Sequence, residues 1–139
     1  MTTPSSRPGS ALPVHLLRGV AVAGLAVDAL VHLRLASAFD AIGDQITLGD
    51  LFRLEAAAAA AAGVYLALRD SRLAWLCAGL VAAGGLAALL VAVLEPPAVG
   101  PFPPLAAPGW TTDSILVTVA MAATVVAWLV REALRRRLD

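Results

Sequence analysis

The chain has 139 residues, of which 60% are hydrophobic and only 14% are charged. Soluble domains carry roughly 25% charged residues, and a chain of this length buries only about two-thirds of its surface, so the composition excludes an ordinary soluble globular fold. Ten arginines balance ten acidic residues, and the zero net charge argues against a nucleic-acid partner. The single cysteine, Cys77, excludes an internal disulfide. We therefore expect a membrane protein whose apolar surface is solvated by the lipid bilayer.

Four apolar segments are each long enough to cross a bilayer as a helix, which takes about 20 residues. They span residues 14–38, 48–68, 73–94 and 112–130. The sequence thus predicts an all-α fold, a four-helix transmembrane bundle with up-down-up-down helices. Residues 1–13 are polar and rich in proline, which predicts a flexible cytoplasmic tail. Residues 131–139 are expected to form a basic helix end in the cytoplasm.

The first apolar segment has an alternative interpretation as a signal peptide, because Ala36-Ser37-Ala38 is typical of a cleavage site. Asp28, His32 and Arg34 would then lie in or beside the apolar core of that signal. This placement is unfavourable, so we expect a membrane span.

The connections differ in length and composition. Residues 39–47 form a short polar connection, and residues 69–72 form a tight turn. Residues 95–110 contain six prolines, which cannot continue a helix and predict an extended loop, either a lid or a disordered segment. The sequence Thr111-Thr112-Asp113-Ser114 is typical of a helix N-terminus.

Small residues are abundant in the second and third spans, including seven consecutive alanines at 56–62. Small side chains let neighbouring helices approach closely in lipid. Such contacts form either within one chain or between copies, so the sequence is compatible with a homo-oligomer or with membership of a larger membrane complex.

Arginine positions predict the orientation, because arginines near the ends of spans concentrate on the cytoplasmic side. Eight arginines lie at the ends shared by the two termini and the 69–72 turn, and only Arg34 and Arg53 lie at the opposite ends. We expect both termini in the cytoplasm, and residues 39–47 and 95–110 outside a cell (inner) membrane crossed four times. Aromatic residues are expected at the inner interface (Tyr65, Trp75, Trp128) and at the outer one (Phe39, Phe102, Trp110).

Charged and titratable side chains inside the apolar segments gather in the outer halves of the first two spans: Asp28, His32, Arg34, Asp50, Arg53 and Glu55. At 1.5 Å per residue, Asp28 lies about 15 Å, Glu55 about 12 Å and His32 about 9 Å from the outer ends of their helices. A short connection joins the two helices, so we expect them to be neighbours. The charged groups of one helix then lie at depths similar to those of the other.

The helical period also groups Gly24, Asp28, His32 and Ala36 on one face, which is the best candidate for packing against the second span. Arg34 falls on another face and can extend towards the membrane surface. Asp50 and Arg53 are three residues apart and can pair locally.

A charge in the middle of a membrane costs at least about 2.5–3.5 kcal/mol, so it is expected to face protein or trapped water beside a partner. Three acids against two arginines leave one uncompensated negative charge. A proton on Asp28 or Glu55, a protonated His32, or a bound cation would supply the balance. We expect Asp28, His32 and Glu55 to form a coupled protonatable group, with Arg34, Asp50 and Arg53 completing a ligand-binding or protonatable site.

The function that this pattern favours is a non-enzymatic binding or accessory subunit, with an outer-leaflet polar pocket for a small ligand, a lipid head group or a cation. One alternative is a proton-coupled transporter or a membrane redox enzyme that uses Asp28, His32 and Glu55. Another is that the polar residues only fix the register of two helices.

No motif for a nucleotide, for zinc or for a nucleophilic triad is present. A haem held by two histidines would need a partner for His15 or His32, and spans two to four contain no histidine. We therefore expect no metal, no cofactor and no catalytic residue.

Three segments carry a resemblance: His32-Leu33-Arg34-Leu35-Ala36, Leu48-Gly49-Asp50-Leu51-Phe52-Arg53, and the proline-rich loop that ends in Pro108-Gly109-Trp110. Together they cover spans one and two and the outer loop. The chain resembles small, largely uncharacterised four-span membrane proteins of high-GC bacteria. That resemblance implies the fold and no particular activity.

Overall fold

The computed structural model describes residues 11–42, 45–94 and 111–137. They form four long helices, α1 (Ala11–Ala36), α2 (Leu48–Leu68), α3 (Arg72–Leu94) and α4 (Thr112–Arg136), and a short 3₁₀ turn, η1 (Ser37–Phe39). No strand occurs within these residues, so the all-α four-helix fold is confirmed. The predicted tail lies mostly outside the described residues, and the proline-rich loop lies entirely outside them.

Two helices begin at hydroxyl caps. The Thr47 hydroxyl accepts a hydrogen bond from the amide of Asp50, and the Asp50 carboxylate accepts one from the amide of Thr47. Thr111 and Ser114 make the same reciprocal pair at the start of α4. These pairs satisfy amides that have no partner within the helix, so they fix where α2 and α4 begin. The predicted helix start at Thr111 is confirmed.

All four helices are long and apolar enough to cross a membrane. The 21 residues of α2, for example, span about 31 Å, close to the thickness of the hydrocarbon core. Only 28% of the most apolar window of each helix is buried inside the protein. Large apolar side chains such as Leu54 and Leu68 point outward. This surface suits lipid, and the chain is a multi-pass membrane protein.

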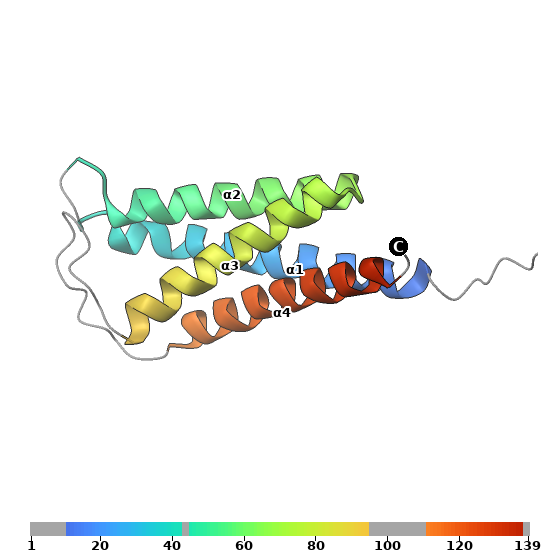
Figure 1. Ribbon diagram of the computed structural model, residues 1–139. Helices are drawn as coiled ribbons and strands as arrows, with labels where there is room; N and C mark the ends of the chain where they lie inside the picture. The colour runs from blue at the N-terminus through green and yellow to red at the C-terminus, as the bar shows by residue number, and fades with distance from the viewer. Residues whose placement is uncertain (1–10, 43–44, 95–110, 138–139) are drawn as a thin grey trace, which may run out of the picture.

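The helices pack as a ring in chain order, and α1 scarcely touches α3. Figure 1 shows that successive helices run in opposite directions, so that α1 begins and α4 ends at the same end of the bundle. We call this the terminal end, and we call the opposite end, where α1 ends and α2 begins, the loop end. Which end faces the cytoplasm stays a prediction.

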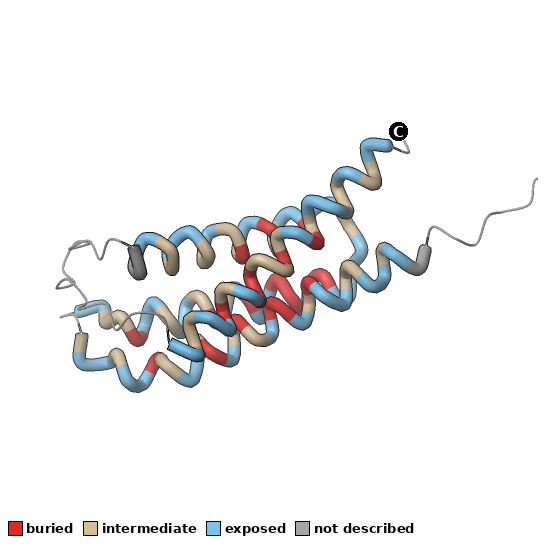
Figure 2. The backbone as a smooth tube through the Cα atoms, turned by 90° about the horizontal axis from the view of Figure 1, so that it is seen from below, coloured by how far each residue is buried: buried red, intermediate tan, exposed pale blue. Residues whose placement is uncertain are grey.

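Buried residues gather inside the bundle, most densely where the helices cross (Figure 2). The core on the terminal side contains mostly small side chains together with Leu25, Leu66 and Trp75. Trp75, which we expected at a membrane interface, is instead fully buried. Its indole N–H donates a 2.7 Å hydrogen bond to Asp70, and the Arg131 guanidinium lies 5.5 Å from its ring centre. These contacts tie the α2–α3 turn to the end of α4.

Helix α1 approaches α4 closely at Gly24. A Cβ atom there would lie 2.6 Å from the carbonyl oxygen of Ala120 and would collide with the Thr124 hydroxyl. The Thr124 hydroxyl lies 3.4 Å from the carbonyl oxygen of Ala21, so a polar contact also crosses the interface. The prediction that the face of α1 containing Gly24 packs against α2 is therefore wrong at Gly24. At this position α1 packs against α4, because only a glycine leaves room for the α4 backbone.

This close approach predicts that Gly24→Ala destabilises the protein by about 1–3 kcal/mol, the usual cost of overpacking. The obstacle is partly the Ala120 backbone, which cannot rotate away. Thermal unfolding in detergent micelles, followed by circular dichroism, measures the change. Gly84→Ala is the matched control, because a Cβ at Gly84 meets nothing within 4 Å. Equal unfolding temperatures for the two variants would contradict the α1–α4 contact.

Candidate functional site

Asp28 lies in the second half of α1 and has 0% of its surface exposed. The helix backbone fixes its position one turn after Gly24, at the level where α1 is held against α4. Neither carboxylate oxygen receives a hydrogen bond from the described residues. An unpaired polar atom in a dry interior costs free energy, and an ionised one costs more. The Asp28 carboxylate therefore depends on contacts other than ordinary hydrogen bonds to stay buried.

His32 follows Asp28 by one helical turn. Its Nδ1 lies 2.8 Å from Oδ1 of Asp28 and 3.0 Å from the carbonyl oxygen of the same residue. Nδ1 of His32 thus lies within reach of two oxygens of the same residue, one from the side chain and one from the backbone. The His32 side chain is 17% exposed. It therefore connects the sealed carboxylate to the less buried part of the bundle.

Glu55 reaches the same region from α2. It is half-buried, and its Oε1 has no hydrogen-bond partner among the described residues. A Cβ atom on Gly85 of α3 would lie 2.9 Å from Oε1 and 2.7 Å from Cε of Met121 in α4. The missing side chain at Gly85 therefore leaves room for the carboxylate between three helices.

Asp28 and His32 are in contact on α1, and the Glu55 carboxylate of α2 also lies inside the bundle, so we call these three residues the buried trio. Its charge is −1 if His32 is protonated and both acids are ionised, and −2 if His32 is neutral. Two like charges at one site resist joint ionisation, because each raises the cost of charging the other. The arrangement therefore favours fewer negative charges than two ionised acids would carry.

The remaining predicted site residues do not join the trio. Arg34 is exposed and makes no ion pair with any described residue. Arg53 donates two hydrogen bonds to Asp40, of 2.8 and 2.7 Å, and one of 3.2 Å to Asp50. These three side chains, which we call the loop-end clamp, are 44–52% exposed. Neither arginine neutralises the buried acids, so the charge balance expected from the sequence does not hold inside the bundle.

Aromatic rings separate the trio from the clamp. The rings of His32 and Phe52 meet edge to face with centres 5.3 Å apart, and Phe52 meets Phe39 in the same way at 5.0 Å. Such pairs hold ring orientation beyond simple burial. They keep His32 in place at the loop-end side of Asp28.

Sequence reasoning missed two parts of this arrangement. Asp40 was not singled out, although it is the main partner of Arg53. The capping role of Asp50 was also missed, although threonine followed by an acid three residues later is a recognised start signal for a helix.

Sequence reasoning also missed two grooves at the terminal end. One has a volume of about 450 Å³ and lies between α3 and α4, with Arg72, Glu132 and Arg136 among its lining residues. The other, of about 420 Å³, lies between α1 and α2 and includes His15 and Arg18. Neither groove includes a member of the buried trio.

No three His, Cys, Asp or Glu side chains within the described ranges are grouped so that they could hold a metal ion. Comparison with known proteins adds no function: no family model, curated protein or solved structure matches the chain.

The loop-end clamp gives a prediction on pH. The Arg53 guanidinium, through its hydrogen bonds and its charge, holds the pKa of Asp40 below its ordinary value of 3.8. A lowered folded-state pKa means that the stabilisation is fully present above pH 3.8 and is lost as the pH falls through the folded-state value. Arg53→Ala should therefore lower the unfolding temperature slightly at neutral pH, and the difference from wild type should vanish in acid.

Thermal unfolding in micelles over a series of pH values measures this difference. The matched control is Arg34→Ala, which removes the same charge from the same end of the bundle without touching the clamp. A difference for Arg53→Ala that persists unchanged well below pH 3.8 would show that the Asp40 carboxylate is not the group involved.

Proposed function

We propose that the protein is a non-enzymatic membrane protein whose buried trio binds a small cation, and that this cation is a proton. The observation that carries the proposal is Asp28. Its carboxylate is fully buried, its close partner is the His32 imidazole at 2.8 Å, and a second half-buried carboxyl group, Glu55, enters the bundle from α2. A proton removes the unfavourable charge without requiring space.

Larger ligands fit the trio less well. The carboxylate of Asp28 has no exposed surface, so a small organic molecule would have to separate the helices. Two acids repel the phosphate of a lipid head group. A transition-metal ion needs three or more converging ligands, a grouping absent from the described residues. The proton is the cation that these observations favour.

His32 provides the route for exchange. Its Nδ1 faces Asp28, and its partly exposed ring lies towards the loop end. An imidazole can accept a proton on one nitrogen and release one from the other. On the opposite side, the apolar core separates Asp28 from the terminal end. These features support a site that exchanges protons from the loop end only, which suits a proton-responsive binding or accessory subunit.

Proton-coupled transport is the second candidate. It is favoured by the polar network at the terminal end, where Nη1 of Arg131 is buried without a hydrogen bond among the described residues. A proton crossing the bundle would have to pass from the trio to this network through the apolar core.

The test is infrared difference spectroscopy of the full chain in liposomes while the pH is varied. Wild type should give a protonated-carboxyl C=O band that Asp28→Asn removes and Glu55→Gln shifts in midpoint, because the two groups titrate together. Asp113→Asn, the same substitution at the start of α4, is the control and should leave the band unchanged. A band unaffected by Asp28→Asn and by Glu55→Gln would exclude a protonatable trio.

Proton flux into the same liposomes, followed with an enclosed pH-sensitive dye, separates the two candidates. Equal flux for wild type and Asp28→Asn removes transport and leaves one-sided proton binding in place. Flux that is present in wild type and absent in Asp28→Asn would favour transport.

A further inference from the structure

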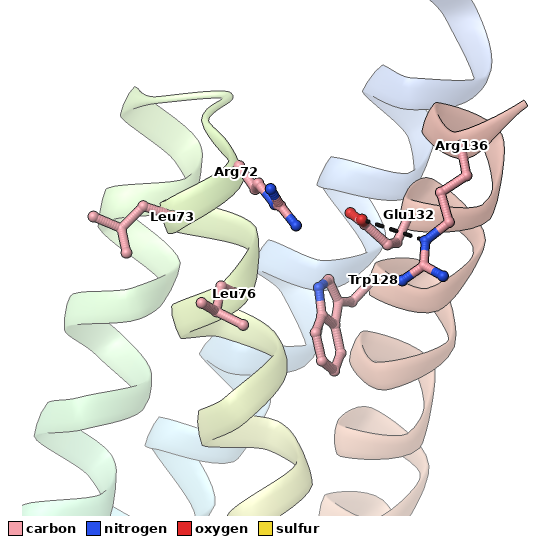
Figure 3. Close-up of a pocket in the computed structure, with 6 residues that line it drawn as sticks. All are labelled: Arg72, Leu73, Leu76, Trp128, Glu132 and Arg136. Carbon is pink, nitrogen blue, oxygen red and sulfur yellow. Dashed lines mark ion pairs between the residues drawn. The ribbon is translucent and has the colours of Figure 1, made fainter. Parts of the chain in front are cut away.

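The groove between α3 and α4 at the terminal end combines a charged rim with an apolar floor. Figure 3 shows Arg72 extending from the start of α3 towards Glu132, and Arg136 paired with the same glutamate from the end of α4. Leu73, Leu76 and Trp128 form the apolar part. Charge and apolar surface therefore lie side by side where the bundle reaches the membrane surface.

The rim has more positive charge than its one acid can neutralise. Glu132 accepts hydrogen bonds of 2.8 and 3.3 Å from Arg135 and lies 3.8 Å from Arg131. Arg136 comes no nearer to it than 3.7 Å, with a side chain that is 76% exposed. Arg72 makes no ion pair with any described residue. The charges of Arg72 and Arg136 are thus available to an anion.

The floor of the groove is held in a fixed shape. A Cβ atom on Gly79 would collide with the indole ring of Trp128, so the ring rests directly on the α3 backbone. Leu73 and Leu76 beside it are 58% and 41% exposed. An indole at the membrane surface, next to exposed leucines, suits the glycerol region and the upper acyl chain of a lipid.

We propose that this groove binds an anionic phospholipid from the leaflet at the terminal end, with the lipid phosphate between Arg72 and Arg136 and an acyl chain along Leu73, Leu76 and Trp128. Two guanidinium groups from different helices offer several N–H donors to one phosphate. The bound lipid would join the beginning of α3 to the end of α4. This proposal does not depend on the buried trio.

The first test is native mass spectrometry of the full chain in detergent with added phosphatidylglycerol or phosphatidylcholine of the same acyl chains. We expect preferential retention of phosphatidylglycerol, weakened about fivefold by each of Arg72→Ala and Arg136→Ala and roughly 25-fold by both. Arg34→Ala, which removes an arginine from the other end, is the matched control and should retain the lipid. Circular dichroism checks that the double variant is folded.

Several outcomes would overturn the proposal. Equal retention of the two lipids would remove the role of charge. Displacement of phosphatidylglycerol by inorganic phosphate at the same concentration would mean that the site takes free phosphate. Loss of the lipid in Arg18→Ala, with no loss in the double variant, would move the site to the groove between α1 and α2.

A second measurement locates the lipid. Brominated acyl chains quench nearby tryptophan fluorescence, so brominated phosphatidylglycerol should quench wild type more than brominated phosphatidylcholine does. That excess should be lost in Trp128→Phe and in the Arg72→Ala, Arg136→Ala double variant. An excess that survives in Trp128→Phe would place the lipid elsewhere and contradict the proposal.

Discussion

The burial of the Asp28 carboxylate is the constraint on which the rest of the bundle depends. A charge at that depth costs at least about 2.5–3.5 kcal/mol by insertion scales, and the close partner of this carboxylate among the described residues is the His32 imidazole, 2.8 Å away. If the proposed proton is bound here, the state of the site and the stability of α1 depend on the same group.

Two glycines make this burial physically feasible. At Gly24 the α1 backbone meets α4 directly, which closes the core one turn from Asp28. At Gly85 the absent side chain leaves room for Glu55 next to Met121. Gly24 lets two helices pack closely and keeps lipid out, whereas Gly85 leaves room for the Glu55 carboxyl group inside the bundle. Small residues in this bundle thus serve helix packing and the polar interior together.

The sequence predicts the four helices and the identity of the buried trio, because hydrophobic length and isolated polar residues are local signals. It does not predict that Gly24 contacts α4, since a glycine on a helix accepts any close neighbour. The six-residue site divides into the buried trio and the loop-end clamp because Arg53 pairs with Asp40, thirteen residues away across a connection. That pairing depends on the path of the connection, which composition does not specify. The capping role of Asp50, in contrast, was readable from Thr47 three residues earlier.

The two ends of the bundle differ in their balance of acids and arginines, and this difference bears on the proposed proton exchange. At the loop end, Arg53 pairs with two exposed acids, and His32 leads inward to Asp28. At the terminal end, arginines outnumber acids. A proton leaving Asp28 towards the terminal end would cross the apolar core and then approach like charges, which repel it. Exchange through His32 meets neither barrier. The backbone contact at Gly24 holds α1 against α4, and this packing supports the proposal of a proton site that is reached from the loop end.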